Sequence, residues 1–164
     1  MSLRFGILTA SDRSSKGERQ DQTSPALEAV IKSENWQVVR VAIVPDDLQV
    51  IKDTLIIWIE EGGLDVILTT GGTGFSPRDN TPEATLEVVE RLAPGMAEAM
   101  RNYSMQLTPH AMLSRGVAGI RKDVLIINIP GSPKAAIENF KVIQPVLAHA
   151  VELLKNDPES EKHH

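Results

Sequence analysis

Apolar and polar positions along the chain form short apolar runs that alternate with segments of helical spacing. The runs are rich in Val, Ile and Leu, as strands are, and the segments between them repeat apolar residues every three or four positions. The predicted strands are residues 4–10, 36–44, 65–70, 116–121 and 124–129. The predicted helices run from 23 or 24 to 33, and over 48–61, 81–92, 96–106, 133–142 and 145–154. This alternation is typical of a three-layer α/β protein, with a mostly parallel sheet and helices on both of its faces.

Turn and capping residues indicate where several elements begin or end. Lys122 and Asp123 separate the last two strands, which form either a hairpin or two strands joined by a tight turn. Thr81 is a good N-cap and Pro82 suits the first helical position, so a helix is expected to begin there. Pro145 interrupts the last helical segment, and we expect the helix to restart at this residue.

Four polar clusters each follow the carboxyl end of a predicted strand. They are Ser11 to Arg13, Pro45 to Asp47, Gly71 to Asp79, and Gly131 with Ser132. In an open parallel sheet these strand ends lie along one edge, where ligands of such folds bind. We therefore expect the four clusters to converge on one ligand cleft at the carboxyl edge of the sheet.

The third cluster has the chemistry of a phosphate cradle. Gly71, Gly72 and Gly74 can adopt positive φ and carry no side chain, so successive N–H groups can point at an anion. The helix predicted from Thr81 would add its positive end nearby. No Gly-Lys-Ser/Thr follows, so the loop is not a Walker A motif. A glycine turn between strand and helix that binds no ligand would have the same sequence, and this alternative stays open.

Carboxylates near this loop indicate a metal ion. Asp46 and Asp79 are poor neighbours for a phosphate group unless a cation lies between them, and Mg²⁺ takes carboxylate and phosphate oxygens at once. Asp12 is a third candidate, near the metal or as a base. Each carboxylate also has a structural explanation. Asp79 can favour the start of a helix, Asp46 is a common residue after a strand, and Asp12 can cap the loop that follows it.

Composition limits the class of protein. The chain has 164 residues, of which 41% are hydrophobic and 24% are charged, as in ordinary globular domains. We expect one domain over residues 1–155 and a disordered tail over 156–164, whose terminal histidine pair could be the remnant of a tag. The sequence contains no cysteine, which excludes disulfides, thiolate catalysis and cysteine-ligated metal sites.

Charge and hydropathy narrow the partners and the compartment. The net charge of −5 argues against broad nucleic-acid binding, which needs a basic surface. No run approaches the roughly 18 to 20 apolar residues of a membrane helix, and the N-terminus lacks the order of a signal peptide. We therefore expect a cytoplasmic protein that holds an anionic ligand through local cations and backbone N–H groups, with no nucleic acid and no membrane as partner.

Three motifs, ILTASDR, TTGGTGFSPRDNTPEAT and LIINIPGSPKA, follow one another in the chain. In this order they resemble the MoaB/Mog family of molybdenum cofactor biosynthesis, and the similarity covers about residues 3–154. The resemblance implies a compact α/β fold, a homotrimer, and the Mg-ATP-dependent adenylylation of molybdopterin with release of pyrophosphate. It also implies a transient contact with the protein that inserts molybdenum into the product.

The resemblance assigns roles to residues already singled out. The two essential aspartates of the family fall on Asp46 and Asp79, which would hold Mg²⁺, and its serine in PGSP falls on Ser132. Arg13 and Lys134 are further cations that, by position, could offset the acidic charge. The predicted substrate-binding set joins the glycine loop to its neighbours at the same edge, and consists of Ser11, Asp12, Gly71, Gly72, Thr73, Gly74, Arg78, Gly131 and Ser132.

Two other functions stay open. One is a pterin-binding trimer that carries or hands over the cofactor without adenylylating it. The other is a different nucleotide-dependent transferase with its site at the same edge. Replacement of Asp79 separates the enzyme from the carrier, because the enzyme should lose turnover while it still binds pterin, whereas the carrier should be almost unaffected.

Overall fold

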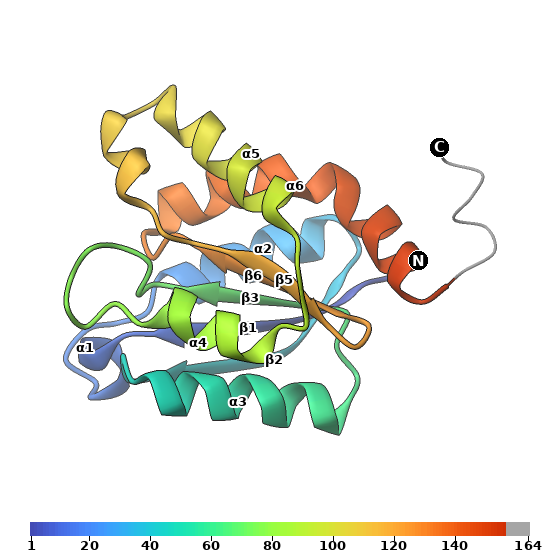
Figure 1. The fold of residues 1–164 in the computed structure, drawn as a ribbon, viewed down its shortest axis with the longest axis horizontal. Coiled ribbons are helices and arrows are strands. Elements are labelled where there is room, and N and C mark those ends of the chain that lie inside the picture. Colours follow the sequence, from blue (N-terminus) through green and yellow to red (C-terminus); the bar gives the residue numbers. More distant parts are fainter. Residues whose placement is uncertain (157–164) are drawn as a thin grey trace.

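The computed structural model describes residues 1–156, so the expectation of a disordered tail lies, apart from Asn156, outside the described residues. Six strands form one sheet in the order β2-β1-β3-β6-β5-β4 (Figure 1). The strands are β1 (Arg4–Ala10), β2 (Gln37–Val44), β3 (Val66–Thr70), β4 (Arg91–Leu92), β5 (Ala118–Arg121) and β6 (Val124–Ile129). The helices are α1 (Asp12–Ser15), α2 (Thr23–Ser33), α3 (Leu48–Glu61), α4 (Thr81–Val88), α5 (Pro94–Met105), the 3₁₀ helix η1 (Pro109–Leu113) and α6 (Pro133–Leu154).

The four strands β2, β1, β3 and β6 run parallel and end at the same level. In the register, Ala10 lies opposite Val44, Thr9 lies opposite Thr70, and Thr70 lies opposite Ile129. β5 and β6 form an antiparallel hairpin, and β4 adds two residues at the far edge of the sheet. The loops that follow β1, β2, β3 and β6 therefore all leave the sheet at one edge.

Helices cover both faces of the sheet, which confirms the predicted three-layer architecture (Figure 1). α2, α5 and α6 pack on one face, around a cluster that includes the fully buried Phe5, Leu27 and Phe140. α3 and α4 pack on the other face, around Leu55 and Trp58. Full burial of one large apolar side chain contributes about 1.5–3 kcal/mol. Two such layers hold the strand ends, and the loops that leave them, in fixed positions.

Three helix boundaries differ from the prediction. α5 begins at Pro94, two residues before the predicted start, because proline suits the first helical position. The expected restart at Pro145 is wrong, because α6 runs unbroken past this residue. Phe140 and Leu147, one on each side of the proline, are both fully buried, so packing on the sheet outweighs the missing N–H. α4 ends at Val88 instead of Leu92, because Arg91 and Leu92 leave the helix to pair with β5.

Two short helices were not predicted. In α1, the hydroxyl oxygen of Ser11 accepts a hydrogen bond from the N–H of Ser14 over 3.1 Å. In η1, the hydroxyl oxygen of Thr108 accepts one from the N–H of His110 over 3.3 Å. Neither helix contains a buried residue. They form through local capping, so no apolar periodicity in the sequence indicates them.

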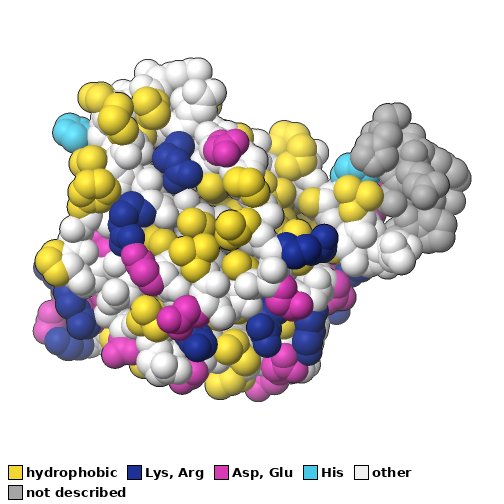
Figure 2. Space-filling model, in the orientation of Figure 1, with side chains coloured by type: hydrophobic (Ala, Val, Ile, Leu, Met, Phe, Trp, Pro, Cys, Tyr) yellow, Lys and Arg dark blue, Asp and Glu magenta, His cyan; other side chains and the backbone are white. Residues whose placement is uncertain are grey.

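The surface over α5 and η1 is rich in apolar side chains, which gather in the upper left of the view in Figure 2. Leu107 and Met112 are the most exposed of them, at 57% and 62%. None of the helices within residues 1–156 combines the length and the apolar character that crossing a bilayer requires.

Candidate functional site

The structure brings the four polar clusters together at the carboxyl edge of the sheet. The N–H of Ser11 donates to the carbonyl oxygen of Val44 over 2.9 Å, which joins the ends of β1 and β2. A Cβ on Gly131 would lie 3.2 Å from the Cα of Gly71, so the loops after β3 and β6 are also in contact. Thr23, at the start of α2, donates its hydroxyl to the carbonyl oxygen of Gly131 over 2.6 Å.

Asp12 and Asp46 tie together the loops that follow β1 and β2. The N–H of Asp12 donates to Oδ2 of Asp46, and the N–H of Asp46 donates to Oδ1 of Asp12, each over 3.0 Å. Arg78 forms a bidentate pair with Asp12, with Nε and Nη2 each 2.9 Å from a carboxylate oxygen. Arg78, which was predicted to belong to the substrate-binding set, therefore already balances the charge of Asp12.

The two carboxylates have opposite electrostatic environments. Burial raises the pKa of Asp46, and the negative charges of Asp12 and Asp79 raise it further. A hydrogen bond from the N–H of Asp12 lowers this pKa, but by less than burial raises it. The hydrogen bonds from Arg78 lower the pKa of Asp12. Asp12 is therefore a stable anion, whereas ionised Asp46 would gain from a cation beside it.

Asp79 closes the glycine-rich loop through its own carboxylate. The N–H of Ser76 donates to Oδ2 of Asp79 over 3.0 Å, and the N–H of Asp79 donates to the carbonyl oxygen of Ser76 over 2.9 Å. Among the residues that the structure describes, Oδ1 of Asp79 and Oδ1 of Asp46 accept no hydrogen bond. Each carboxylate thus keeps one oxygen for a cation, which fits the predicted Mg²⁺.

A cation here would need ligands from outside the chain. Within residues 1–156, no group of three or more His, Asp or Glu side chains has an arrangement that could hold a metal ion. Mg²⁺ is usually held in proteins by one or two carboxylates together with substrate phosphates and water. Two carboxylates beside a glycine-rich loop, without a closed cage of ligands, match that pattern.

Gly71 and Gly72 are required by the backbone itself. Their φ angles are +83° and +68°, in the region that favours glycine. A Cβ on Gly71 would lie 2.6 Å from the carbonyl oxygen of Ala10. A Cβ on Gly72 would lie 2.4 Å from Oγ1 of Thr81 and 3.2 Å from Oδ1 of Asp46. Close packing explains both glycines without a ligand, and it also places the loop directly against Asp46.

The loop and the start of α6 provide donors for an anion. Within the described part of the chain, the N–H groups of Gly72, Thr73 and Gly74 donate no hydrogen bond. The hydroxyl of Ser132 caps α6 by accepting from the N–H of Ala135 over 3.3 Å, so the positive end of this 22-residue helix lies at the same edge. A chain with a net negative charge can hold phosphate through such groups.

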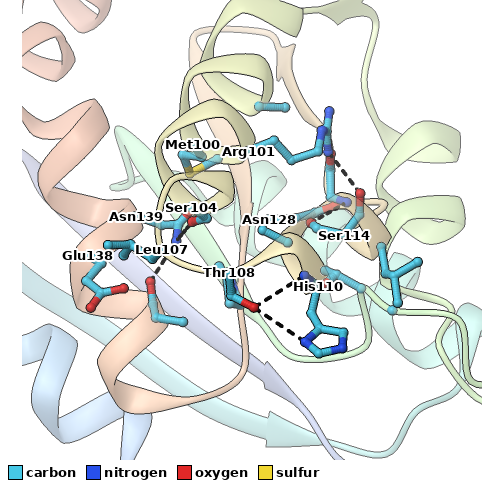
Figure 3. A pocket seen from close by; sticks show the side chains of 18 residues that line it. Met100, Arg101, Ser104, Leu107, Thr108, His110, Ser114, Asn128, Glu138 and Asn139 are labelled. Carbon is cyan, nitrogen blue, oxygen red and sulfur yellow. Dashed lines mark hydrogen bonds between the residues drawn. The ribbon is translucent and has the colours of Figure 1, made fainter.

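Two cavities use the glycine-rich loop as part of their walls. The first, which we call the polar cavity, has a volume of about 560 Å³ and is lined by residues of the predicted set, namely Ser11, Gly71, Gly131 and Ser132, together with Arg19. The second, the apolar cavity, has a volume of about 340 Å³ and lies between α5, η1 and α6, with Thr73 and Gly74 in its wall (Figure 3). Among the described residues, neither lining includes Asp46 or Asp79.

The wall of the apolar cavity combines apolar side chains with a few polar groups (Figure 3). Met100 and Leu107 contribute apolar surface. The amide of Asn139 donates to the hydroxyl of Ser104 over 3.0 Å. Such a lining suits a flat heterocycle with polar edges. The sequence predicts a helix over 96–106 but does not indicate that this helix lines a cavity. The cavity forms only where α5 and η1 fold over α6.

A buried network of hydroxyl groups lies at the wall of the polar cavity. Oγ1 of Thr9 is 2.9 Å from the hydroxyl oxygens of both Ser24 and Thr70. Asp21 accepts hydrogen bonds from the N–H groups of Thr23 and Ser24, over 3.0 and 3.2 Å, and from the Ser24 hydroxyl. Asp21 therefore fixes the start of α2 against the strand ends. The sequence analysis missed it, because it follows no strand and belongs to none of the motifs.

Arg115 is the other residue that the sequence analysis missed. In the sequence it lies between η1 and β5, so it does not follow any of the parallel strands directly. Its guanidinium donates to the carbonyl oxygens of Gly74 and Asp79, over 2.7 and 2.9 Å. Only the folded chain brings this position to the loop that carries Asp79.

The fold and the site define a class of protein: an α/β protein with a glycine-rich loop and carboxylates at the carboxyl edge of a mostly parallel sheet. A family described as "Probable molybdopterin binding domain" matches residues 6–149. The chain belongs to this family, the MoaB/Mog family that its motifs resemble.

Similar proteins include single enzymes and much longer chains. The crystal structure of the molybdopterin biosynthesis enzyme MoaB from Thermus thermophilus has a TM-score of 0.89 and 49% identity, and the match covers 95% of this chain and 98% of that one. The molybdopterin adenylyltransferase of Helicobacter pylori (strain J99) is 40% identical, over 93% of this chain and 88% of its own length. The gephyrin of Dictyostelium discoideum is 42% identical over 94% of this chain, but the chain spans only 23% of the length of gephyrin.

Proposed function

We propose that this protein is a molybdopterin adenylyltransferase, which transfers the adenylyl group of ATP to molybdopterin and releases pyrophosphate during molybdenum cofactor biosynthesis. One observation carries the proposal. Asp46 and Asp79 each keep one carboxylate oxygen that accepts no hydrogen bond within residues 1–156, beside a loop whose N–H groups are equally available. The name of the Helicobacter pylori relative supports the same activity.

In the proposed reaction, an oxygen of the terminal phosphate of molybdopterin attacks the α-phosphorus of ATP. The bond between the α-phosphorus and the oxygen that bridges to the β-phosphate breaks, and pyrophosphate leaves with the electron pair. The attacking phosphate oxygen is already an anion, so no proton has to be removed first. Catalysis therefore depends on positioning the two substrates and on stabilising negative charge.

Asp46 and Asp79 would hold Mg²⁺, which would supply neutralisation of charge on the phosphates and on the leaving pyrophosphate. The N–H groups from Gly72 to Gly74, together with the start of α6 at Ser132, would bind phosphate oxygens. Asp12 would orient Asp46 through its own N–H, and Arg78 would keep Asp12 ionised.

The two cavities suit different parts of the substrates. The polar cavity, with Arg19 and the Ser132 cap in its wall, suits phosphate groups. The apolar cavity, at about 340 Å³, is large enough for one heterocycle, the pterin or the adenine. The glycine-rich loop belongs to both walls, so it would lie between a bound ring and the phosphates.

We further propose a cytoplasmic homotrimer that passes its product to the molybdenum-insertion protein of the pathway. The family resemblance supports the trimer, and so does apolar surface that a second copy could cover. This surface includes Val39, Val41 and Ile43 on the edge strand β2. Sedimentation equilibrium should give the mass of three chains, and the mass of one chain would reject the trimer.

The alternative is a trimer that binds molybdopterin without adenylylating it. It is favoured by the position of Asp46 and Asp79, neither of which lines the polar or the apolar cavity in the described structure, so that a pterin ring could bind without them. Mass spectrometry of the pterin after incubation with ATP and Mg²⁺ separates the two functions. A mass increase by one adenylyl group supports the transferase, whereas bound but unchanged molybdopterin supports the carrier.

A further inference from the structure

Arg115 connects the two ends of the loop formed by residues 73–79. From its guanidinium, Nε donates to the carbonyl oxygen of Gly74 over 2.7 Å and Nη2 donates to that of Asp79 over 2.9 Å. Its own N–H donates to the carbonyl oxygen of Thr73 over 2.8 Å. One residue thus makes three hydrogen bonds to the main chain of the segment that carries Asp79.

Glu83, in the first turn of α4, holds the guanidinium in place. Nη1 of Arg115 pairs with Oε1 of Glu83, and Nη2 lies 3.5 Å from Oε2. The hydrogen bond between them raises the pKa of Arg115 and lowers the pKa of Glu83. The ion pair is neutral as a whole, and Arg115 lines neither cavity among the described residues. Arg115 is therefore placed to act on the loop and not on a substrate phosphate.

Much of the rest of the loop faces solvent, and its other link to the sheet edge is the ion pair of Arg78 with Asp12. The side chain of Phe75 is 68% exposed and that of Arg78 is 61% exposed. The turn between Ser76 and Asp79 is internal to the loop and cannot fix it against the sheet. A planar guanidinium can donate to two carbonyl oxygens and a carboxylate at once, which a lysine ammonium on a flexible stem does less well.

We propose that Arg115 is a positioning residue, which holds the 73–79 loop so that the carboxylate of Asp79 stays beside Asp46 where both can bind the cation. This inference rests on the proposed function, because it assumes that Asp79 is a ligand of the cation. Removal of the guanidinium should loosen the loop and weaken cation binding, although every group that touches substrate remains in the chain.

Hydrogen exchange tests the loop without any need for activity. In Arg115→Ala, the hydrogen-bonded amides of Ser76, Asp79 and Thr81 should exchange about tenfold faster than in the wild type, because the loop that holds them loses hydrogen bonds to two of its carbonyls. Amides in the middle of α3 should not change. Arg121→Ala is the matched control, because Arg121 also donates to a carbonyl oxygen, that of Val88 over 3.0 Å, and lies near a glutamate, Glu60. It should leave exchange in the 73–79 loop as it is.

Cation binding tests the consequence for the site. Mn²⁺ is titrated by electron paramagnetic resonance in the presence of α,β-methylene ATP, which cannot be cleaved at the α-phosphorus. Arg115→Ala should weaken Mn²⁺ binding about 10- to 100-fold, as loss of a residue that orients a metal ligand typically does. Arg115→Lys should lie between the wild type and the alanine variant, and added guanidinium ion should partly restore binding to Arg115→Ala. Arg121→Ala should bind Mn²⁺ like the wild type.

The outcomes separate this inference from the proposed function. Unchanged loop exchange in a folded Arg115→Ala, or equal effects of Arg115→Ala and Arg121→Ala, would overturn the positioning role. If Arg115→Ala does not fold, Arg115→Lys takes its place, and wild-type exchange and Mn²⁺ affinity in that variant would overturn the role as well. If the wild type binds Mn²⁺ and Arg115→Ala binds it more weakly, but neither forms adenylylated pterin, the positioning role stands and the proposed transferase fails.

Discussion

The N–H of Asp12 donates to the carboxylate of Asp46, and the N–H of Asp46 donates to the carboxylate of Asp12, each over 3.0 Å. These residues follow two different strands, β1 and β2, so the exchange fixes the two loops against each other at the carboxyl edge. It turns one oxygen of Asp46 toward the main chain of Asp12 and leaves the other near Gly72. The geometry of the proposed metal ligand therefore depends on Asp12.

Asp12→Ala should lower kcat about 10- to 100-fold, because the N–H of Asp46 and the guanidinium of Arg78 both lose their acceptor, which loosens the loops that carry Asp46 and Asp79. Steady-state pyrophosphate release at saturating substrates measures the effect. Asp47→Ala is the matched control. It removes the hydrogen bond from the N–H of Val50 that caps α3, and should cost about 1 kcal/mol of stability with little change in kcat. Equal losses of kcat in both variants would contradict a specific role for Asp12.

Gly72→Ala should destabilise the protein by about 1–3 kcal/mol, because alanine disfavours the positive φ at this position and its Cβ would lie 2.4 Å from Oγ1 of Thr81. Gly17→Ala provides the comparison. Gly17 has a similar φ of +74°, but its Cβ would have nothing within 4 Å among the described residues, so only the backbone strain remains. Urea denaturation of both variants gives the difference. Equal destabilisation would show that the contact with Thr81 is not tight.

Asp46→Asn should stabilise the metal-free protein at about pH 7 but not at about pH 3.5. Burial raises the pKa of Asp46 in the folded state above its value in the unfolded chain, so folding disfavours the ionised form. The contribution of Asp46 to stability is therefore greatest below the unfolded pKa and is lost as the pH rises through the folded pKa. Asparagine avoids this loss and still offers a carbonyl oxygen to the N–H of Asp12. Urea denaturation at both pH values measures the difference, and a loss of stability at neutral pH would contradict it.

Ala111→Phe should raise KM for molybdopterin or for ATP about tenfold and leave kcat nearly unchanged, because the larger side chain fills the apolar cavity that Ala111 lines. The substrate whose KM rises is the one whose ring occupies the cavity. Met112→Phe is the neighbouring control, since Met112 is 62% exposed and does not line the cavity. Unchanged KM values for both substrates in Ala111→Phe would place both rings elsewhere.

The placement of the site could be predicted from the sequence because it depends on strand direction alone. Once β1, β2, β3 and β6 are recognised as parallel strands, the residues that follow Ala10, Val44, Thr70 and Ile129 must share an edge. The glycines of the loop could be identified for a related reason, because positive φ at Gly71 and Gly72 excludes most other residues.

Features that depend on contacts distant in sequence could not be predicted. Arg115 reaches Asp79 only after β5 pairs with β6, and Asp21 reaches Thr9 only after α2 packs on the sheet. The same holds for Pro145, where local propensity favours a break but burial of α6 on both sides keeps the helix continuous. In each case tertiary packing decides, and the local sequence carries no sign of it.

The central claim is tested most directly by measuring pyrophosphate release when molybdopterin, ATP and Mg²⁺ are incubated with the wild type, Asp46→Asn or Asp79→Asn. Molybdopterin binding to each protein is measured in parallel by fluorescence. The proposed function predicts release that requires molybdopterin in the wild type, loss of this release in both variants, and molybdopterin binding in all three proteins. Binding without release in the wild type, or release that survives both substitutions, would contradict the adenylyl transfer at this pair of carboxylates.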